Sequence, residues 1–119
     1  MAGFTILHQD DFERPFPKWA LARKSLGLQS FGMYVVELPP GESVPEHDET
    51  ATDQEEVFIV LSGEATMVID GEEHAAPAGT FVRLDPEPLR MLANRSDADA
   101  TVLVVSAPRT SGYEPLPWA

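Results

Sequence analysis

Residues 45–63 of the chain read PEHDETATDQEEVFIVLSG, and the change of character within this stretch decides the fold. Its first half, from His47 to Glu56, is rich in carboxylates and contains no lysine or arginine. Its second half is an apolar run of strand length, rich in Val, Ile and Phe, which suits a half-buried pleated surface. The stretch therefore predicts an acidic loop that leads directly into a β-strand.

Short apolar runs of the same kind recur along the chain, separated by turn-forming residues. They predict strands over residues 30–38, 57–62, 64–69, 72–76, 80–84, 89–93 and 100–107. Asp70-Gly71 between two of these runs predicts a hairpin with a type I′ turn. Evenly spaced strands indicate an all-β antiparallel sandwich or barrel, and only residues 17–26 suggest a short helix.

The composition is that of one globular domain, with 119 residues of which 43% are apolar. A formal net charge of −12 argues against sequence-independent binding to nucleic acid or to an anionic membrane. There is no cysteine, so disulfides and thiol chemistry are excluded. No basic segment followed by an apolar one stands at the N-terminus, and no apolar run approaches the roughly 20 residues of a membrane span. We expect a soluble, cytoplasmic protein.

Several residues stand at spacings that form a recognisable motif. Five residues separate Gly41 from His47, six separate Glu56 from Gly63, and a second pattern of Gly, turn and Asn covers residues 79–94. This arrangement resembles the two motifs of the cupin superfamily, and the flanking strands extend the resemblance over most of the chain. The resemblance implies an all-β double-stranded β-helix, or jelly-roll barrel. The short helical segment suggested by residues 17–26 would precede this barrel.

In the cupin superfamily the two motifs supply the ligands of a metal. Transferred position by position, the first histidine falls on His47 and the glutamate on Glu56, both of matching type. The second histidine falls on Glu49, and the loop between Glu49 and Glu56 is longer than in the family's motif. The final histidine falls on Arg90, which carries a permanent charge and no acceptor lone pair and therefore cannot ligate a metal.

Three interpretations of these residues stay open. In the first, His47, Glu49 and Glu56 bind a divalent metal (Mn, Fe, Ni or Zn) and leave positions free for water and substrate. In the second, Arg90 takes over the metal's electrostatic role, points into the barrel mouth and pairs with Glu56, whose pKa it would depress. In the third, the acidic loop faces solvent and only Glu56 belongs to the strand.

We favour the second interpretation, because only one histidine of the motif remains. It predicts a small-molecule-binding or accessory cupin with no cofactor and with a ligand pocket formed by His47, Glu56, Phe58 and Arg90. The alternative is a metal-dependent cupin enzyme of dioxygenase or isomerase type that uses His47, Glu49 and Glu56. No catalytic residue is assigned, because no nucleophile constellation is visible.

The chain is expected to form one cupin domain over residues 1–119, with an N-terminal arm (1–28), a barrel (29–107) and a docking tail (108–119). The strand that follows Glu56 is apolar on both faces, and the tail carries apolar side chains among prolines. Both features indicate apolar surface beyond what one small barrel can hide. They predict a homodimer, with the tail docked on its own barrel or on the partner's.

Overall fold

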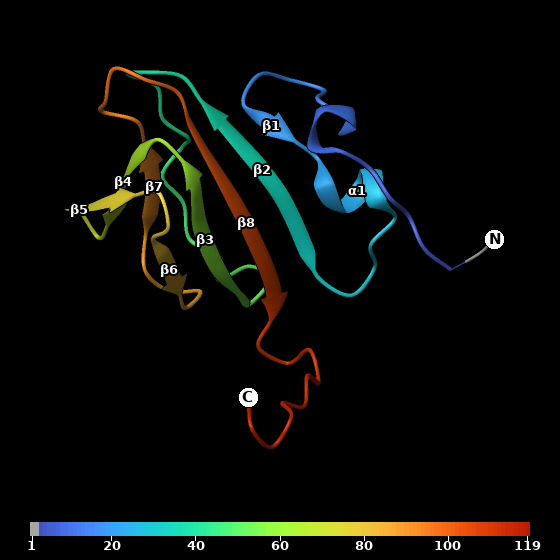
Figure 1. Ribbon diagram of the computed structural model, residues 1–119. Coiled ribbons are helices and arrows are strands. Elements are labelled where there is room, and N and C mark those ends of the chain that lie inside the picture. The colour runs from blue at the N-terminus through green and yellow to red at the C-terminus, as the bar shows by residue number, and fades with distance from the viewer. Residues whose placement is uncertain (1–2) are drawn as a thin grey trace.

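The computed structural model describes residues 3–119 and consists of two antiparallel sheets that face each other (Figure 1). The larger sheet contains, in spatial order, β1 (Trp19–Ala20), β2 (Gly32–Leu38), β8 (Ala100–Pro108), β3 (Gln54–Ser62) and β6 (Phe81–Leu84). The smaller sheet contains, in order, β5 (Glu72–Pro77), β4 (Glu64–Ile69) and β7 (Arg90–Ala93). This two-sheet architecture confirms the all-β sandwich expected from the sequence.

The N-terminal arm contains a 3-10 turn, η1 (Gln9–Asp11), and one short helix, α1 (Ala22–Leu26). The helix expected over residues 17–26 is therefore wrong in its first half. There Lys18 has a positive φ of 79°, which an α-helix does not allow, and β1 pairs with β2 instead. At the other end, Gly27 stops α1 in the left-handed conformation, with its N–H bonded to carbonyls of the last turn. Within residues 3–119, no helix has the length and apolar character of a membrane span.

Strand β3 begins three residues earlier than the sequence suggests. Its first residues, Gln54 to Glu56, pair with Pro108 to Ser106 at the end of β8. The long strand β8 thus supplies backbone partners for polar residues that hydrophobicity alone would assign to a loop. The hairpin between β4 and β5 is confirmed, since Asp70 and Gly71 both have positive φ (49° and 82°), as a type I′ turn requires.

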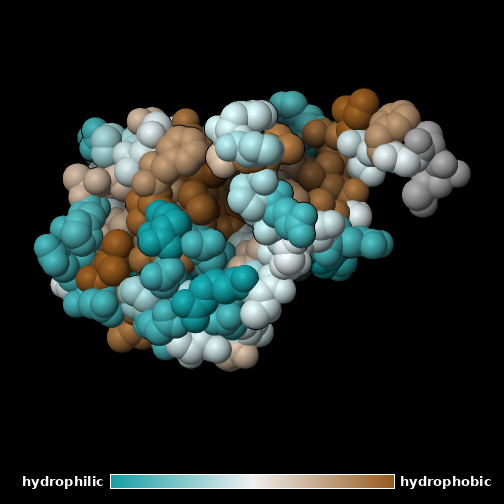
Figure 2. All heavy atoms as spheres, turned by 90° about the horizontal axis from the view of Figure 1, so that it is seen from below, coloured by the Kyte–Doolittle hydropathy of each residue, from teal (hydrophilic) through white to brown (hydrophobic). Residues whose placement is uncertain are grey.

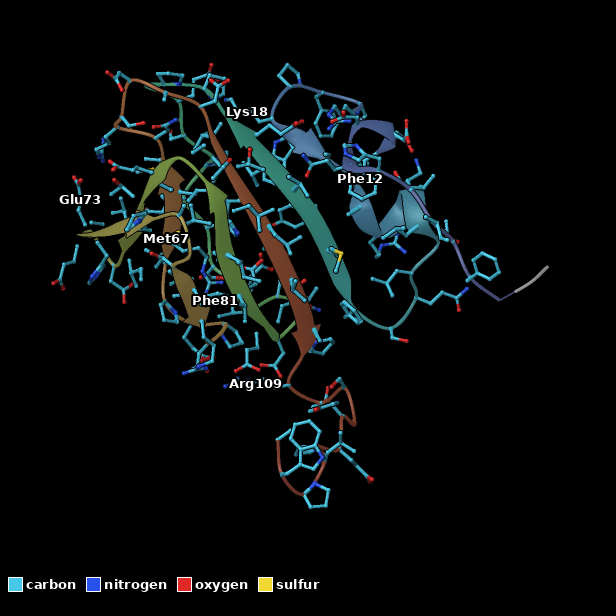
Figure 3. All side chains as sticks on the ribbon, in the orientation of Figure 1. Phe12, Lys18, Met67, Glu73, Phe81 and Arg109 are labelled. Atoms are coloured by element: carbon cyan, nitrogen blue, oxygen red, sulfur yellow. The ribbon has the colours of Figure 1, made fainter. Side chains whose placement is uncertain are left out.

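The hydrophobic core lies between the two sheets, where Met67 of β4 points inward (Figure 3). Its buried members include Val36, Leu38, Phe58, Val60, Met67, Leu84, Leu92, Val102 and Val104. Side chains alternate along a strand, so Glu56 faces the same way as Phe58 and Val60. This alternation places a carboxylate inside the sandwich, at the end where β3 begins.

The segment before the acidic loop runs beside β7 and extends the smaller sheet. Ser43 pairs with Ala93 and His47 pairs with Arg90 in isolated antiparallel bridges. Backbone hydrogen bonds join Val44 N–H to the Leu92 carbonyl and link His47 and Arg90 in both directions. The backbone of His47 is therefore fixed by its pairing with β7, although His47 lies outside the named strands.

The C-terminal tail extends beyond the sandwich (Figure 1). Residues 109–119 are all exposed, and the side chains of Tyr113 and Trp118 are among the most exposed aromatics of the chain. The side chains of Tyr113 and Trp118 are thus largely uncovered by their own barrel. Docking on a partner's barrel stays a prediction.

Candidate functional site

Arg90, the first residue of β7, lies at the centre of the candidate site and is fully buried. Its Nη1 donates a hydrogen bond to Oε1 of Glu56 at 3.1 Å, and Nη2 donates to the backbone carbonyl of Asp85. Glu56 itself is only 2% exposed. The sequence predicted this contact, in which Arg90 points inward to Glu56, and the structure contains it.

The third nitrogen of the Arg90 guanidinium is Nε. Nε is buried and makes no hydrogen bond within the described residues, 3–119. Buried polar groups are nearly always hydrogen-bonded, so a buried donor of this kind marks a position where an acceptor oxygen would be stabilised.

His47 is fixed by contacts at both ring nitrogens. Nδ1 lies 3.0 Å from the carbonyl oxygen of Pro45, and Nε2 lies 3.0 Å from Oε1 of Glu49. Both neighbours are acceptors, and the two contacts fix the orientation of the ring.

The three residues expected to ligate a metal do come together. Ligand atoms of His47, Glu49 and Glu56 all lie within 4.8 Å of one another. However, the Arg90 guanidinium is already bonded to Glu56, and Glu49 already pairs with His47. One nitrogen and two carboxylates remain, with a cation at the fourth position, and this set does not fit the family's four-ligand metal centre.

The electrostatics of Glu56 differ from the expectation. Burial raises the pKa of Glu56, and the nearby Glu49 carboxylate raises it further; Arg90 and His47 oppose this without reversing it. The predicted depression of the Glu56 pKa is therefore wrong, because desolvation and the Glu49 carboxylate outweigh the guanidinium.

Tyr34 of β2 belongs to the site and was not predicted from the sequence. Burial raises the pKa of its hydroxyl, and the carboxylates of Glu56 and Glu49 raise it further. Tyr34 faces inward with Val36 and Leu38, but its place beside Glu56 depends on the spatial order β2-β8-β3. The sequence carries no signal for that order apart from the family resemblance.

The raised pKa of Glu56 predicts a pH dependence of stability. A carboxyl whose folded-state pKa exceeds its unfolded value stabilises the fold most at low pH, and this contribution is lost as pH rises through the folded pKa. We expect the difference in unfolding free energy, wild type minus Glu56→Gln, to fall as pH increases from about 4 to 7. Urea unfolding at several pH values measures it, and a difference that grows with pH would show a depressed pKa instead.

The remaining acidic residues of the loop are ordinary surface charges. Glu46 and Asp48 are exposed, Asp53 pairs with Arg109 at 2.6 Å, and Glu55 pairs with Arg83 at 2.9 Å. The third interpretation therefore describes these charges and the place of Glu56 in the strand. It does not describe Glu49, which pairs with His47, and the strand begins at Gln54, before Glu56.

Phe58 and the motif residue Asn94 lie in the architecture around the site. Phe58, expected in the ligand pocket, is 3% exposed and belongs to the hydrophobic core. Asn94 is buried; its side-chain amide donates to the carbonyls of Leu38 (2.9 Å) and Ala98 (2.7 Å), and its Oδ1 accepts from Ser96.

Comparison with solved structures gives the same architecture in several relatives. A cupin protein from Bacteroides fragilis is similar over 99% of this chain and 94% of its own, with a TM-score of 0.80 and 24% identity. A cupin-superfamily sugar phosphate isomerase from Silicibacter pomeroyi is 25% identical, with a TM-score of 0.72 over 87% of this chain and 75% of its own. The cupin domain of an XRE family transcriptional regulator from Enterobacter cloacae is 26% identical, with a TM-score of 0.60 over 67% of this chain and 84% of its own.

No curated protein matches the chain. The family model described as the cupin domain matches residues 34–106, which include both motifs and most of β2 and β8. The matched region contains every residue of the candidate site, from Tyr34 to Arg90. The chain therefore belongs to the cupin domain family.

Proposed function

We propose that the chain is a small-molecule-binding or accessory cupin whose barrel site works without a resident metal. The observation that carries this proposal is the buried pair of Arg90 and Glu56, at the position where the resemblance expects a ligand histidine. A guanidinium at this point satisfies the buried carboxylate and supplies the positive charge that a metal would bring.

The polar groups around the pair indicate the class of ligand. The buried Nε of Arg90 needs an acceptor oxygen, while the carboxylates of Glu49 and Glu56 accept hydrogen bonds from hydroxyl groups. A small polyhydroxylated molecule offers both functions, and the relative named a sugar phosphate isomerase is compatible with this class. Calorimetric titration with neutral sugars and with sugar phosphates tests it, and the absence of binding in both series would contradict the ligand class.

A metal-dependent cupin enzyme of isomerase or dioxygenase type is the second candidate. The observation in its favour is the close grouping of His47, Glu49 and Glu56 within 4.8 Å. In this alternative Arg90 would remain bonded to Glu56 and hold that carboxylate in place.

Elemental analysis of protein purified without a metal-affinity step distinguishes the two candidates. We expect bound Mn, Fe, Ni or Zn well below one ion per chain, because Arg90 and His47 already satisfy both carboxylates. A stoichiometric metal that disappears in a His47→Ala variant would overturn the proposal and support the enzyme.

Arg90→His provides a gain-of-function version of the same test. It restores a fourth ligand type and removes the permanent charge, so we expect Zn or Ni to bind stoichiometrically through His47, Glu56 and the new imidazole. Arg95→His is the control, because Arg95 lies on the surface paired with Glu73. Equal metal binding by both variants would argue against a converted metal site.

A further inference from the structure

The C-terminal tail presents apolar side chains to solvent from a fixed base. Tyr113, Leu116 and Trp118 are 75%, 56% and 83% exposed. At its base, Arg109 donates its backbone N–H to the Asp53 carbonyl at 3.1 Å, and its guanidinium bonds the side chains of Asp53 and Glu87. Because these bonds fix the base on the sandwich, the tail leaves the domain in a defined direction. Its apolar side chains are exposed to solvent.

The outer face of the larger sheet is also apolar. The strand register aligns two rows of outward residues across β2, β8, β3 and β6, namely Met33, Val105, Val57 and Arg83, then Val35, Leu103, Ile59 and Phe81. Helix α1 packs against β2, and Val35 is buried. Toward the other edge Phe81, seen on β6 in Figure 3, is 69% exposed and Leu61 is 48% exposed. The half of the face formed by β8, β3 and β6 is therefore only partly covered.

A cavity of about 810 Å³ lies between this face and the start of the tail. Its walls include Phe31, Val57 and Val105 on one side and Tyr113 on the other. Seen from below, hydrophobic surface is visible in a hollow near the middle of the molecule (Figure 2). The cavity is continuous with the apolar rows, since Val57 and Val105 belong to both.

We propose that this face binds the tail of a second copy of the chain, with the two tails exchanged about a two-fold axis. A two-fold contact covers both apolar features of each copy at once, because each chain supplies one tail and one face. A buried aromatic side chain removes roughly 150–250 Å² from water. Two aromatics per tail, with the sheet surface that they cover, bring the total above the ~1,000 Å² of a specific interface.

The dimensions and composition of the tail match the face. Ten residues follow Arg109, and at about 3.1 Å per residue an extended Pro-rich segment spans roughly 30 Å. The nine-residue strand β8 at about 3.3 Å per residue has a similar length. Pro115 and Pro117 lack the N–H needed to pair at a sheet edge, so the tail is suited to lie across a face through its side chains.

The charge of the chain makes the interface distinguishable from an ion-paired one. Two copies with a net charge of −12 repel each other, while the proposed contact is apolar. Added salt screens that repulsion, so we expect the dimer to become tighter with increasing ionic strength.

Light scattering on the full chain at micromolar concentration tests the assembly. We expect a dimer mass for the wild type and a monomer mass for a chain that ends at Arg109, with circular dichroism showing that both are folded. Trp118→Ser in the full-length chain should raise the dimer dissociation constant at least ~10-fold, as for a central interface tryptophan. The control is Phe4→Ala with Ile6→Ala, which removes exposed apolar groups from the N-terminal arm and should leave the mass unchanged. A monomeric wild type, or a truncated chain that stays dimeric, would overturn the proposal.

Cross-linking between two chains of different size tests whether the tail of one copy lies on the sheet face of the other. The chain has no cysteine, so a Leu116→Cys chain and a Val57→Cys chain each carry one thiol. A bismaleimide added to their mixture should join one chain of each kind. In the control, a Glu72→Cys chain takes the place of the Leu116→Cys chain. Its thiol lies on the exposed strand β5, so mixing it with the Val57→Cys chain should give no cross-linked product. If a chain carrying both cysteines links only to itself while the mixture gives no product, the tail docks within its own chain and the exchange is wrong.

Discussion

Replacing Arg90 with Ala is expected to lower the unfolding free energy by about 3–5 kcal/mol, because it leaves a buried carboxylate without its partner. Glu56 is 2% exposed, and its bond to Arg90 is fully enclosed. Domains of this kind are stable by only about 5–15 kcal/mol, so the variant should lose a large fraction of its stability. Equilibrium unfolding in urea measures the change.

The control for this prediction is Arg95→Ala. Arg95 also pairs with a glutamate, Glu73 at 2.8 Å, but both side chains are about half exposed. We expect this substitution to change stability by less than about 0.5 kcal/mol. A similarly small effect at Arg90 would show that the buried pair contributes nothing to folding. Replacing both members, with Arg90→Met and Glu56→Leu, should recover much of the loss, since an apolar pair leaves no buried charge.

Gly63→Ala is expected to produce the second large loss. Gly63 joins β3 to β4 with φ of 76°, and an added Cβ would overlap the carbonyl oxygen of Asp99 and lie 2.9 Å from Cα of Ala100. The left-handed conformation costs a non-glycine residue about 1–2 kcal/mol. Overpacking against backbone adds roughly 1–3 kcal/mol, because backbone atoms cannot rotate out of the way.

Gly41→Ala isolates the steric part of this effect. Gly41 has nearly the same φ, 77°, but nothing lies within 4 Å of an added Cβ. We expect it to lose only the conformational cost of about 1–2 kcal/mol. Thermal or urea unfolding of the two variants should therefore differ, and equal losses would show that the backbone around Gly63 relaxes freely.

The strands and the β4–β5 hairpin could be predicted because each is encoded locally. Alternation of apolar residues and the Asp70-Gly71 turn depend only on neighbours in the sequence. The start of β3 at Gln54 and the short strand β1 were missed, since both depend on a partner strand far along the chain. Pairing with β8 or β2 supplies hydrogen bonds that outweigh local preference.

The candidate site, too, could be predicted from the sequence only in part. The spacing of the two motifs was sufficient to predict that Arg90 meets Glu56, because it assigns both to positions that converge in the family fold. It could not predict the sign of the Glu56 pKa shift, which depends on how deeply the carboxylate is buried and on the nearby charge of Glu49. Tyr34 was missed for the related reason that its neighbours come from another strand.

Asn94 carries a consequence for how cupin sequences are compared. Its amide group holds the end of β2 and the turn that follows β7, and its backbone binds Glu42 and Gly41. The last residue of the second motif thus maintains the scaffold, while Arg90, four positions earlier, determines which charge enters the barrel. In this chain the asparagine of the motif therefore reports on the scaffold and not on the chemistry of the site. An activity inferred for this chain from a relative should therefore be checked first against Arg90, whose charge meets Glu56 inside the barrel.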